Sequence, residues 1–482
     1  MKQIDALPDD ILLEIFDFYV TIISPSHWGK RAIEAWQLLV HVCRRWRNLV
    51  FGSPRRLNLR LYCTPETPAK DILDLWPALP LIVRGDKSMA LLSGTVRTDN
   101  VIAALGQSNR VCKVSLLELT NWQLEKVLAA MQAPFPELTD LELCSHYKTL
   151  QVIPLPDSFL GGSAPSLRNF ELSGIPFPGL PNLLLSSTHL VRLSLSNIPH
   201  SGYISPEAIV ALISVLSSLD TLHLIFQSPQ SRPDWQSRRL PAPQRSILPA
   251  LTKFSFKGVT EYLEELVIRI NTPQLDKMGI TFFNQIDFNC PQLTQFINCT
   301  PTLTGRASGD WVEAHVQFTD SAASVKLRYR TSHSTLDRLE IVILCREPDR
   351  QLSSIEQVCN GSFLHPLSTV VGVNIERRCW LREMENDGIE STLWLQFLLP
   401  FTSAKGLLLS KELAPGIAAA LEELDGSRIT EVLPSLQNIY VAEPELSGPF
   451  KEKIGRFVSM RQHSGHPIGI STFDISKALE SI

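Results

Sequence analysis

The sequence predicts an α/β protein in which a small all-α segment of three helices precedes an irregular α/β solenoid. Apolar residues recur with helical spacing through residues 1–57, and a short leucine-rich phrase returns repeatedly between residues 108 and 445. Hydrophobic residues make up 44% of the chain and charged residues 20%, which is typical of folded proteins. At 482 residues the chain is too long for one compact core, so we expect a small domain followed by a repeat array.

The first predicted helix begins at Pro8. Proline suits the first helical turn because its missing N–H would have no partner there, and Asp9 and Asp10 place negative charge at the helix N-terminus. The residues that follow divide into a polar face with Asp10, Glu14 and Asp17, and an apolar face with Ile11, Leu12, Ile15, Phe16 and Tyr19. An amphipathic helix is therefore expected.

A second apolar stripe of helical period continues until Ser53 and Pro54 end it. It comprises Ile33, Trp36, Leu39, Val42 or Cys43, Trp46, and Leu49 or Val50, and residues 21–31 before it are predicted to form a loop. A unit of this size carries more apolar side chains than its own core can bury. We therefore expect a second protein to cover the surplus.

Residues 7–16 have the form LPxxILxxIF and residues 42–50 have the form VCRRWRxLV. In this order these two blocks resemble an F-box, and residues 51–57 extend the likeness to F-box proteins of fungi. The resemblance implies docking to a Skp-family adaptor and through it to a cullin. It assigns adaptor binding to Leu7, Pro8, Ile11, Leu12, Ile15, Phe16, Cys43, Trp46 and Leu49, the last three being shared with the core of the module. The predicted loop at 21–31 departs from the pattern, since many F-box modules are shorter there.

The repeated phrase reads LxxLxL, where other large apolar residues can replace leucine. It occurs at 111–116, 138–143, 167–172, 190–195, 219–224, 251–256, 275–280, 336–341 and 436–441. From residue 138 to residue 275 the copies are about 29, 23, 29, 32 and 24 residues apart, close to the period of leucine-rich repeats, which they resemble. That family forms a solenoid in which each unit is a short strand with a return segment. Residues 305–330 break the phrase and are interpreted as an irregular or inserted repeat.

Side chains alternate along a strand, so the third and fifth letters of each phrase should point away from the core. We predict that these positions bind the target protein, with an acidic patch first and basic positions after it. The candidates are Asp140, Glu142, Asn169, Glu171, Arg192, His223, Lys253 and Lys277. An equally acceptable interpretation is that these positions form a face that is exposed to solvent and binds no partner.

The predicted organisation is an F-box at 1–57, a linker and N-terminal capping region at 58–107, leucine-rich repeats at 108–445, and a C-terminal cap or tail at 446–482. Between Gln227 and Ser246 the chain is rich in proline and arginine and cannot form a regular element. Loops this long tend to be either functional or disordered.

Several classes of function are disfavoured. A net charge of -4 provides no basic field for nucleic acid, and the motifs of phosphate-binding loops, zinc hydrolases, serine esterases and zinc ribbons are absent from the sequence. We therefore expect no active site, no metal and no cofactor. Nine singly placed cysteines, the lack of a signal peptide and the lack of a long apolar run indicate a cytoplasmic or nuclear protein without a membrane span.

Two functions remain after these exclusions. The first is a substrate-recognition adaptor of an SCF-type cullin-RING ubiquitin ligase, which is non-catalytic itself and binds a target protein that the sequence does not identify. The alternative is a non-ligase leucine-rich-repeat scaffold for protein interactions.

Overall fold

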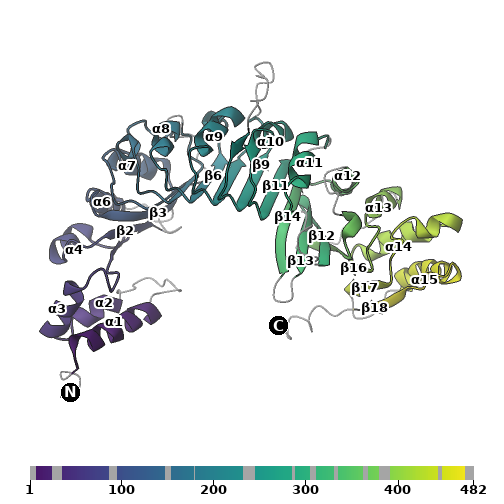
Figure 1. The fold of residues 1–482 in the computed structure, drawn as a ribbon, viewed down its shortest axis with the longest axis horizontal. Helices are drawn as coiled ribbons and strands as arrows, with labels where there is room; N and C mark the ends of the chain where they lie inside the picture. Colours follow the sequence, from purple (N-terminus) through teal and green to yellow (C-terminus); the bar gives the residue numbers. More distant parts are fainter. Residues whose placement is uncertain are drawn as a thin grey trace. The chain divides into compact units, whose positions relative to one another are not determined.

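The computed structural model describes residues 7–23, 35–85, 95–146, 153–177, 180–231, 245–284, 288–303, 311–330, 335–361, 367–378, 391–442 and 448–472. They belong to two compact units, Met1–Ser187 (unit 1) and Thr188–Ile482 (unit 2). In both units strands alternate with helices, and the helices that connect the strands lie on one side of them (Figure 1). We call the other side of the strands the open face.

Unit 1 begins with the three predicted helices, which the structure confirms as α1 (Asp9–Ile23), α2 (Ala35–Val40) and α3 (Arg44–Gly52). Most of the loop predicted at 21–31 lies outside the described residues. The three helices enclose a small core that contains Leu12, Leu13, Phe16, Trp36, Leu39, Val40 and Val50. Within it the rings of Phe16 and Trp46 pack with their centroids 4.7 Å apart.

Parallel strands follow the three helices in unit 1, paired in chain order. They are β1 (Leu61–Cys63), β2 (Leu81–Gly85), β3 (Val111–Leu119), β4 (Asp140–Ser145) and β5 (Asn169–Ser173). The connections contain α4 (Ala69–Leu75), α6 (Thr95–Leu105), α7 (Asn121–Ala130) and the 3-10 turn η1 (Phe159–Gly162), and α8 (Leu180–Leu185) follows β5. Residues 58–107, predicted as a linker and cap, thus already supply strands and helices to this array.

The first part of unit 2 repeats the same plan. Its strands β6 (Arg192–Ile198), β7 (Thr221–Phe226), β9 (Lys253–Gly258) and β11 (Lys277–Phe283) pair in parallel. The return segments contain η2 (His200–Gly202), α9 (Pro206–Ile213), α10 (Thr260–Val267) and α11 (Pro291–Asn298), and a separate short pair is formed by β8 (Ser246–Ile247) and β10 (Ile270–Asn271). Of the loop predicted at 227–246, residues 232–244 lie outside the described ranges.

Where the phrase breaks, three antiparallel strands interrupt the array: β12 (Trp311–Thr319), β13 (Ala322–Arg330) and β14 (Thr335–Leu344). The last of them, β14, pairs in parallel with β11, and β13 lies between β14 and β12. The first of them, β12, then pairs in parallel with β15 (Gly372–Arg378). Both outer strands of the insertion therefore run in the direction of the repeats, and pairing continues across it.

The remainder of unit 2 returns to alternating helices and parallel strands. Its elements are α12 (Pro348–Asn360), α13 (Ser391–Leu398), β16 (Gly406–Ser410), α14 (Ala414–Glu422), the 3-10 turn η5 (Gly426–Thr430), β17 (Asn438–Ala442), α15 (Gly448–His463) and β18 (Gly469–Thr472). The segment predicted as a cap or tail thus contributes a helix and a strand.

A recurrent backbone contact keeps the register of the strands although the repeats differ in length. The carbonyl oxygen of Asp220, just before β7, accepts hydrogen bonds from the N–H groups of Thr252 (2.9 Å) and Lys253 (3.0 Å) at the start of β9. The carbonyl of Thr252 accepts in the same way from Asp276 and Lys277, and that of Lys405 from Gln437 and Asn438. Differences in repeat length are therefore absorbed by the return segments.

Helix α15 is anchored by a buried cation. Arg461 is fully buried and donates to the carbonyl oxygens of Ile429 (3.0 Å), Leu433 (3.2 Å) and Pro434 (3.3 Å) in the segment that leads to β17. Buried backbone carbonyls need hydrogen-bond donors, and the guanidinium group supplies them here.

Candidate interaction surfaces

Helix α1 has two apolar faces. Leu12, Leu13 and Phe16 face the core, whereas Ile11, Ile15 and Phe18 point to solvent and are exposed by 47%, 47% and 69%. The exposed residues follow the i, i+4, i+7 spacing of one helical face. We call Ile11, Ile15 and Phe18 the N-terminal apolar stripe. Leu38 in α2 and Val42 just after it are exposed as well.

Contacts from α3 and from the turn that follows it hold this helix in place. The Arg45 guanidinium donates to Oδ1 of Asp9 (2.6 and 3.0 Å) and to the carbonyl oxygen of Leu7 (2.5 Å), and Arg56 pairs with Glu14. Residues 42–56 therefore hold the first turns of α1, and the N-terminal apolar stripe lies on a helix that is fixed by side-chain contacts.

The structure separates the predicted adaptor-binding residues into three groups. Pro8, Ile11 and Ile15 are exposed, and Leu7, Cys43, Trp46 and Leu49 are half-buried. Leu12 and Phe16 are buried, so their assignment to a surface that touches a partner needs correction: their side chains fill the core of the three helices.

Leu12 and Phe16 differ from Ile11 and Ile15 because α1 has two apolar faces. Leu12, Leu13 and Phe16 form the face that packs against the other helices, and Ile11 and Ile15 lie on the face that is exposed. Phe18 does not belong to the predicted apolar face, which continues at Tyr19; the i+7 spacing of Phe18 from Ile11 is the signal that identifies it. Cys43 has a structural role, since it is the N-cap of α3 and its Sγ accepts from the Trp46 N–H at 3.5 Å.

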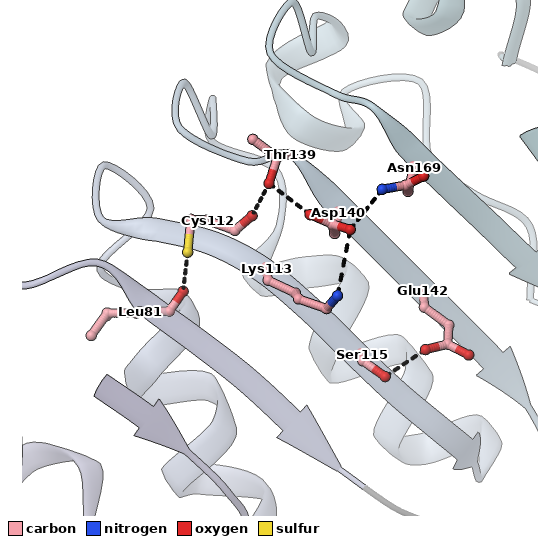
Figure 2. A network of polar contacts seen from close by, with 8 residues as sticks. All are labelled: Leu81, Cys112, Lys113, Ser115, Thr139, Asp140, Glu142 and Asn169. Carbon is pink, nitrogen blue, oxygen red and sulfur yellow. Dashed lines mark hydrogen bonds and ion pairs between the residues drawn. The ribbon is translucent and has the colours of Figure 1, made fainter. Parts of the chain in front are cut away.

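The open face of unit 1 carries a network of polar side chains, shown in Figure 2. Asp140 on β4 lies between Lys113 on β3 (3.4 Å) and Asn169 on β5 (2.8 Å), and the Ser115 hydroxyl donates to Glu142 (2.6 Å). Glu171 is opposite Glu142 in the register of β4 and β5. The structure thus brings together the predicted candidates of this unit, Asp140, Glu142, Asn169 and Glu171.

Asp140 is the electrostatic centre of this network. Partial burial by itself would raise the pKa of its carboxyl group, but hydrogen bonds from Thr139 and Asn169 and the nearby Lys113 ammonium outweigh burial and lower the pKa below its ordinary value. The carboxylate is therefore ionised at neutral pH and joins neighbouring strands on the open face.

We expect this carboxylate to make the stability of unit 1 dependent on acidity. Because the pKa of Asp140 is lower in the folded state than the usual value of about 3.9, its contribution is fully present above about pH 4 and is lost as the pH falls through the folded-state pKa. In thermal unfolding series from neutral to acidic pH, Asp140→Asn should therefore differ from the wild type most near neutrality. The difference should shrink on acidification.

Asp157→Asn, at an exposed position, is the control and should match the wild type throughout. A difference between Asp140→Asn and the wild type that does not change with pH would contradict this role of Asp140.

The open face of unit 2 is basic at its first strands. Lys253 on β9 is in register with Lys277 on β11 and with Thr221 on β7, and Thr221 is in register with Arg192 on β6. His223 lies two residues beyond Thr221 along β7, between Ser194 and Ser255. Burial lowers the pKa of the His223 imidazole, and the positive charges of Arg192 and Lys253 lower it further, so the ring is neutral at pH 7. The predicted candidates Arg192, His223, Lys253 and Lys277 therefore share one surface.

Among the described residues, no group of three or more His, Cys, Asp and Glu side chains is arranged to hold a metal ion. The same part of the chain contains no helix that is both long and apolar enough to span a membrane.

No protein-family description matches the sequence, and no curated protein matches it. A solved structure that is similar to the chain is the leucine-rich repeat-containing protein LegL7 from Legionella pneumophila, with 13% sequence identity and a TM-score of 0.26. The match covers 83% of this chain and 97% of that one.

The class of the protein follows from its own repeats. Each copy of the phrase between 111 and 280 lies on or directly before a parallel strand, and a return segment leads to the next strand. The fold is therefore an α/β solenoid of the leucine-rich-repeat type, built from parallel strands and return segments.

Proposed function

We propose that this protein is a substrate-recognition adaptor of an SCF-type cullin-RING ubiquitin ligase. Its N-terminal helices would dock on a Skp-family adaptor, and its repeats would bind the target protein. The observation that carries the proposal is the N-terminal apolar stripe, which is exposed on the helix that bears the LPxxILxxIF block. Exposed apolar residues in a contiguous row are typical of protein interaction sites.

The apolar stripe is large enough to matter energetically. Complete burial of one aliphatic or aromatic side chain contributes about 1.5–3 kcal/mol, and Ile11, Ile15 and Phe18 still have about half or more of their surface to bury. Because association costs at least several kcal/mol of translational and rotational free energy, further contacts from Leu7 and Pro8, or from Leu38 and Val42, are needed for a stable complex.

The repeats support the second half of the proposal. Polar side chains stand in register across the open faces of both units, where they are held by strands rather than by loops. Positions on a rigid scaffold are suited to selective recognition because little conformational entropy is lost on binding. In this mechanism catalysis resides in other subunits, and the chain raises the local concentration of the target beside them.

The test is co-purification of the full chain with a Skp-family adaptor and a cullin. The wild type is expected to capture both. The double variant Ile11→Glu, Ile15→Glu should weaken the adaptor complex by about a hundredfold or more, because it places two charges in an apolar interface. Leu75→Glu is the matched control: Leu75 on α4 is 77% exposed and outside the stripe, so that variant should bind as the wild type does.

Undiminished capture by the double variant would refute the stripe as the docking face. If the wild type itself fails to bind a Skp-family adaptor, the ligase role is rejected and the protein is a scaffold without ligase function.

A further inference from the structure

Four cations gather on the open face at the start of unit 2. Arg192, Lys253 and Lys277 belong to one row across β6, β7, β9 and β11, and Lys257 lies four residues beyond Lys253 on the same face of β9. Neighbouring strands are about 4.8 Å apart and residues along a strand about 3.3 Å, so the four charges cover a field of roughly 14 by 13 Å. We call Arg192, Lys253, Lys257 and Lys277 the basic patch.

Within the described residues, none of these four cations forms an ion pair. The nearby carboxylates are already engaged: Asp276 pairs with Arg338 (3.5 Å), Glu340 pairs with Lys326 (2.9 Å), and Asp220 accepts hydrogen bonds from the hydroxyl groups of Thr221 and Thr252. Lys257 is half-buried above the ring of Phe283, at 5.2 Å from its centroid, and burial lowers the pKa of its ammonium group. Positive charge that is not held in ion pairs, on a partly desolvated surface, favours an anionic partner.

The row between the cations is lined mainly by small side chains. Ser194, His223, Ser255 and Gly279 are side by side in register across β6, β7, β9 and β11. On one side of this row lie Arg192, Lys253 and Lys277, and on the other side lies Lys257. A Cβ atom added at Gly279 would meet only the Ser255 hydroxyl within 4 Å, at 3.7 Å, so a side chain can be introduced at this position without a clash.

We propose that the basic patch binds an acidic segment of a protein, laid across β6 to β11 with its carboxylates or phosphates beside Arg192, Lys253, Lys257 and Lys277. The inference deepens the proposed adaptor function by naming the chemistry of its target. Charge complementarity selects this occupant, because the patch concentrates positive charge in a chain whose net charge is -4. A protein that is acidic overall is poorly suited to hold the long phosphate backbone of a nucleic acid, which is the competing polyanion.

The experiment measures fluorescence anisotropy of labelled decapeptides with the purified full chain, without any ligase subunit. The probes are an alternating Glu-Ser peptide, the same peptide with phosphoserine, its Gln-Ser analogue, and a ten-nucleotide single-stranded RNA. We expect both acidic peptides to bind, the phosphorylated one more tightly, with affinity that falls as salt is added. The Gln-Ser peptide should not bind.

The variant Lys253→Glu, Lys277→Glu should weaken binding of the acidic peptides by about tenfold or more. Gly279→Glu, which places a carboxylate in the row between the cations, should do the same without removing a cation. The matched control is Lys411→Glu, Lys451→Glu, because it changes the net charge equally at exposed positions outside the patch and should bind as the wild type does.

Equal loss of binding in the control would show a nonspecific charge effect and overturn the proposal. It would be overturned equally by tighter binding of RNA than of either acidic peptide, or by absence of acidic-peptide binding in the folded wild type. Since no ligase subunit is present, these outcomes are independent of whether the N-terminal helices bind a Skp-family adaptor.

Discussion

Replacing Phe16 by alanine is expected to destabilise the N-terminal helices by about 3–5 kcal/mol, the usual cost of removing a large buried aromatic side chain. Phe16 is fully buried, and its ring packs on Trp46 at 4.7 Å, so its loss opens a cavity between α1 and α3. Amide hydrogen exchange of the full chain, followed over α1 and α3, measures the effect locally. Protection in these helices should fall while that of β6 to β11 stays unchanged.

Ile15→Ala is the matched control, because Ile15 precedes Phe16 in the same helix and its side chain is exposed by 47%. Its exchange should remain close to that of the wild type. Reversed results, with Ile15→Ala losing protection and Phe16→Ala keeping it, would mean that the inward and outward faces of α1 have been exchanged.

Replacing Arg461 by methionine is expected to destabilise the end of unit 2 by about 3–5 kcal/mol. Methionine keeps much of the volume of the side chain but leaves the carbonyl oxygens of Ile429, Leu433 and Pro434 without their donor, and each unpaired buried polar group costs about 1–3 kcal/mol. Denaturant unfolding, combined with hydrogen exchange over α15 and β17, measures the loss.

Arg456→Met provides the comparison on the same helix. Arg456 is 62% exposed and pairs with Glu422 and Glu452, and exposed pairs of this kind contribute about 0–1 kcal/mol. If Arg461→Met unfolds at the same denaturant concentration as Arg456→Met, the buried guanidinium does not anchor α15.

The elements that could be predicted from the sequence are those with a strong local period. The copies of LxxLxL from 138 to 280 coincide with β4, β5, β6, β7, β9 and β11 because alternating apolar residues must fill the space between strands and helices. The antiparallel insertion could be located but not described. Apolar and polar side chains alternate along a strand in the same way whether its neighbour is parallel or antiparallel. The sequence of β12, β13 and β14 therefore contains no local signal for the order or direction in which they pair.

The candidate surfaces were predictable to a similar extent. Side-chain alternation placed Asp140, Glu142, Lys253 and Lys277 on the open faces, but the partners within each network depend on register, which the sequence does not encode locally. For α1, periodicity detected apolar residues and could not divide them between two faces. That division depends on where α2 and α3 pack, so the sequence pattern does not show that Leu12 and Phe16 face inward.

Because one backbone carbonyl before the strand aligns each repeat with the next, insertions and deletions between strands can accumulate during evolution without displacing the side chains that a target would meet. Changes in the length of the return segments and changes in the outward side chains of the strands are therefore independent of each other. Single outward positions on the strands can be substituted independently of changes in the length of the return segments.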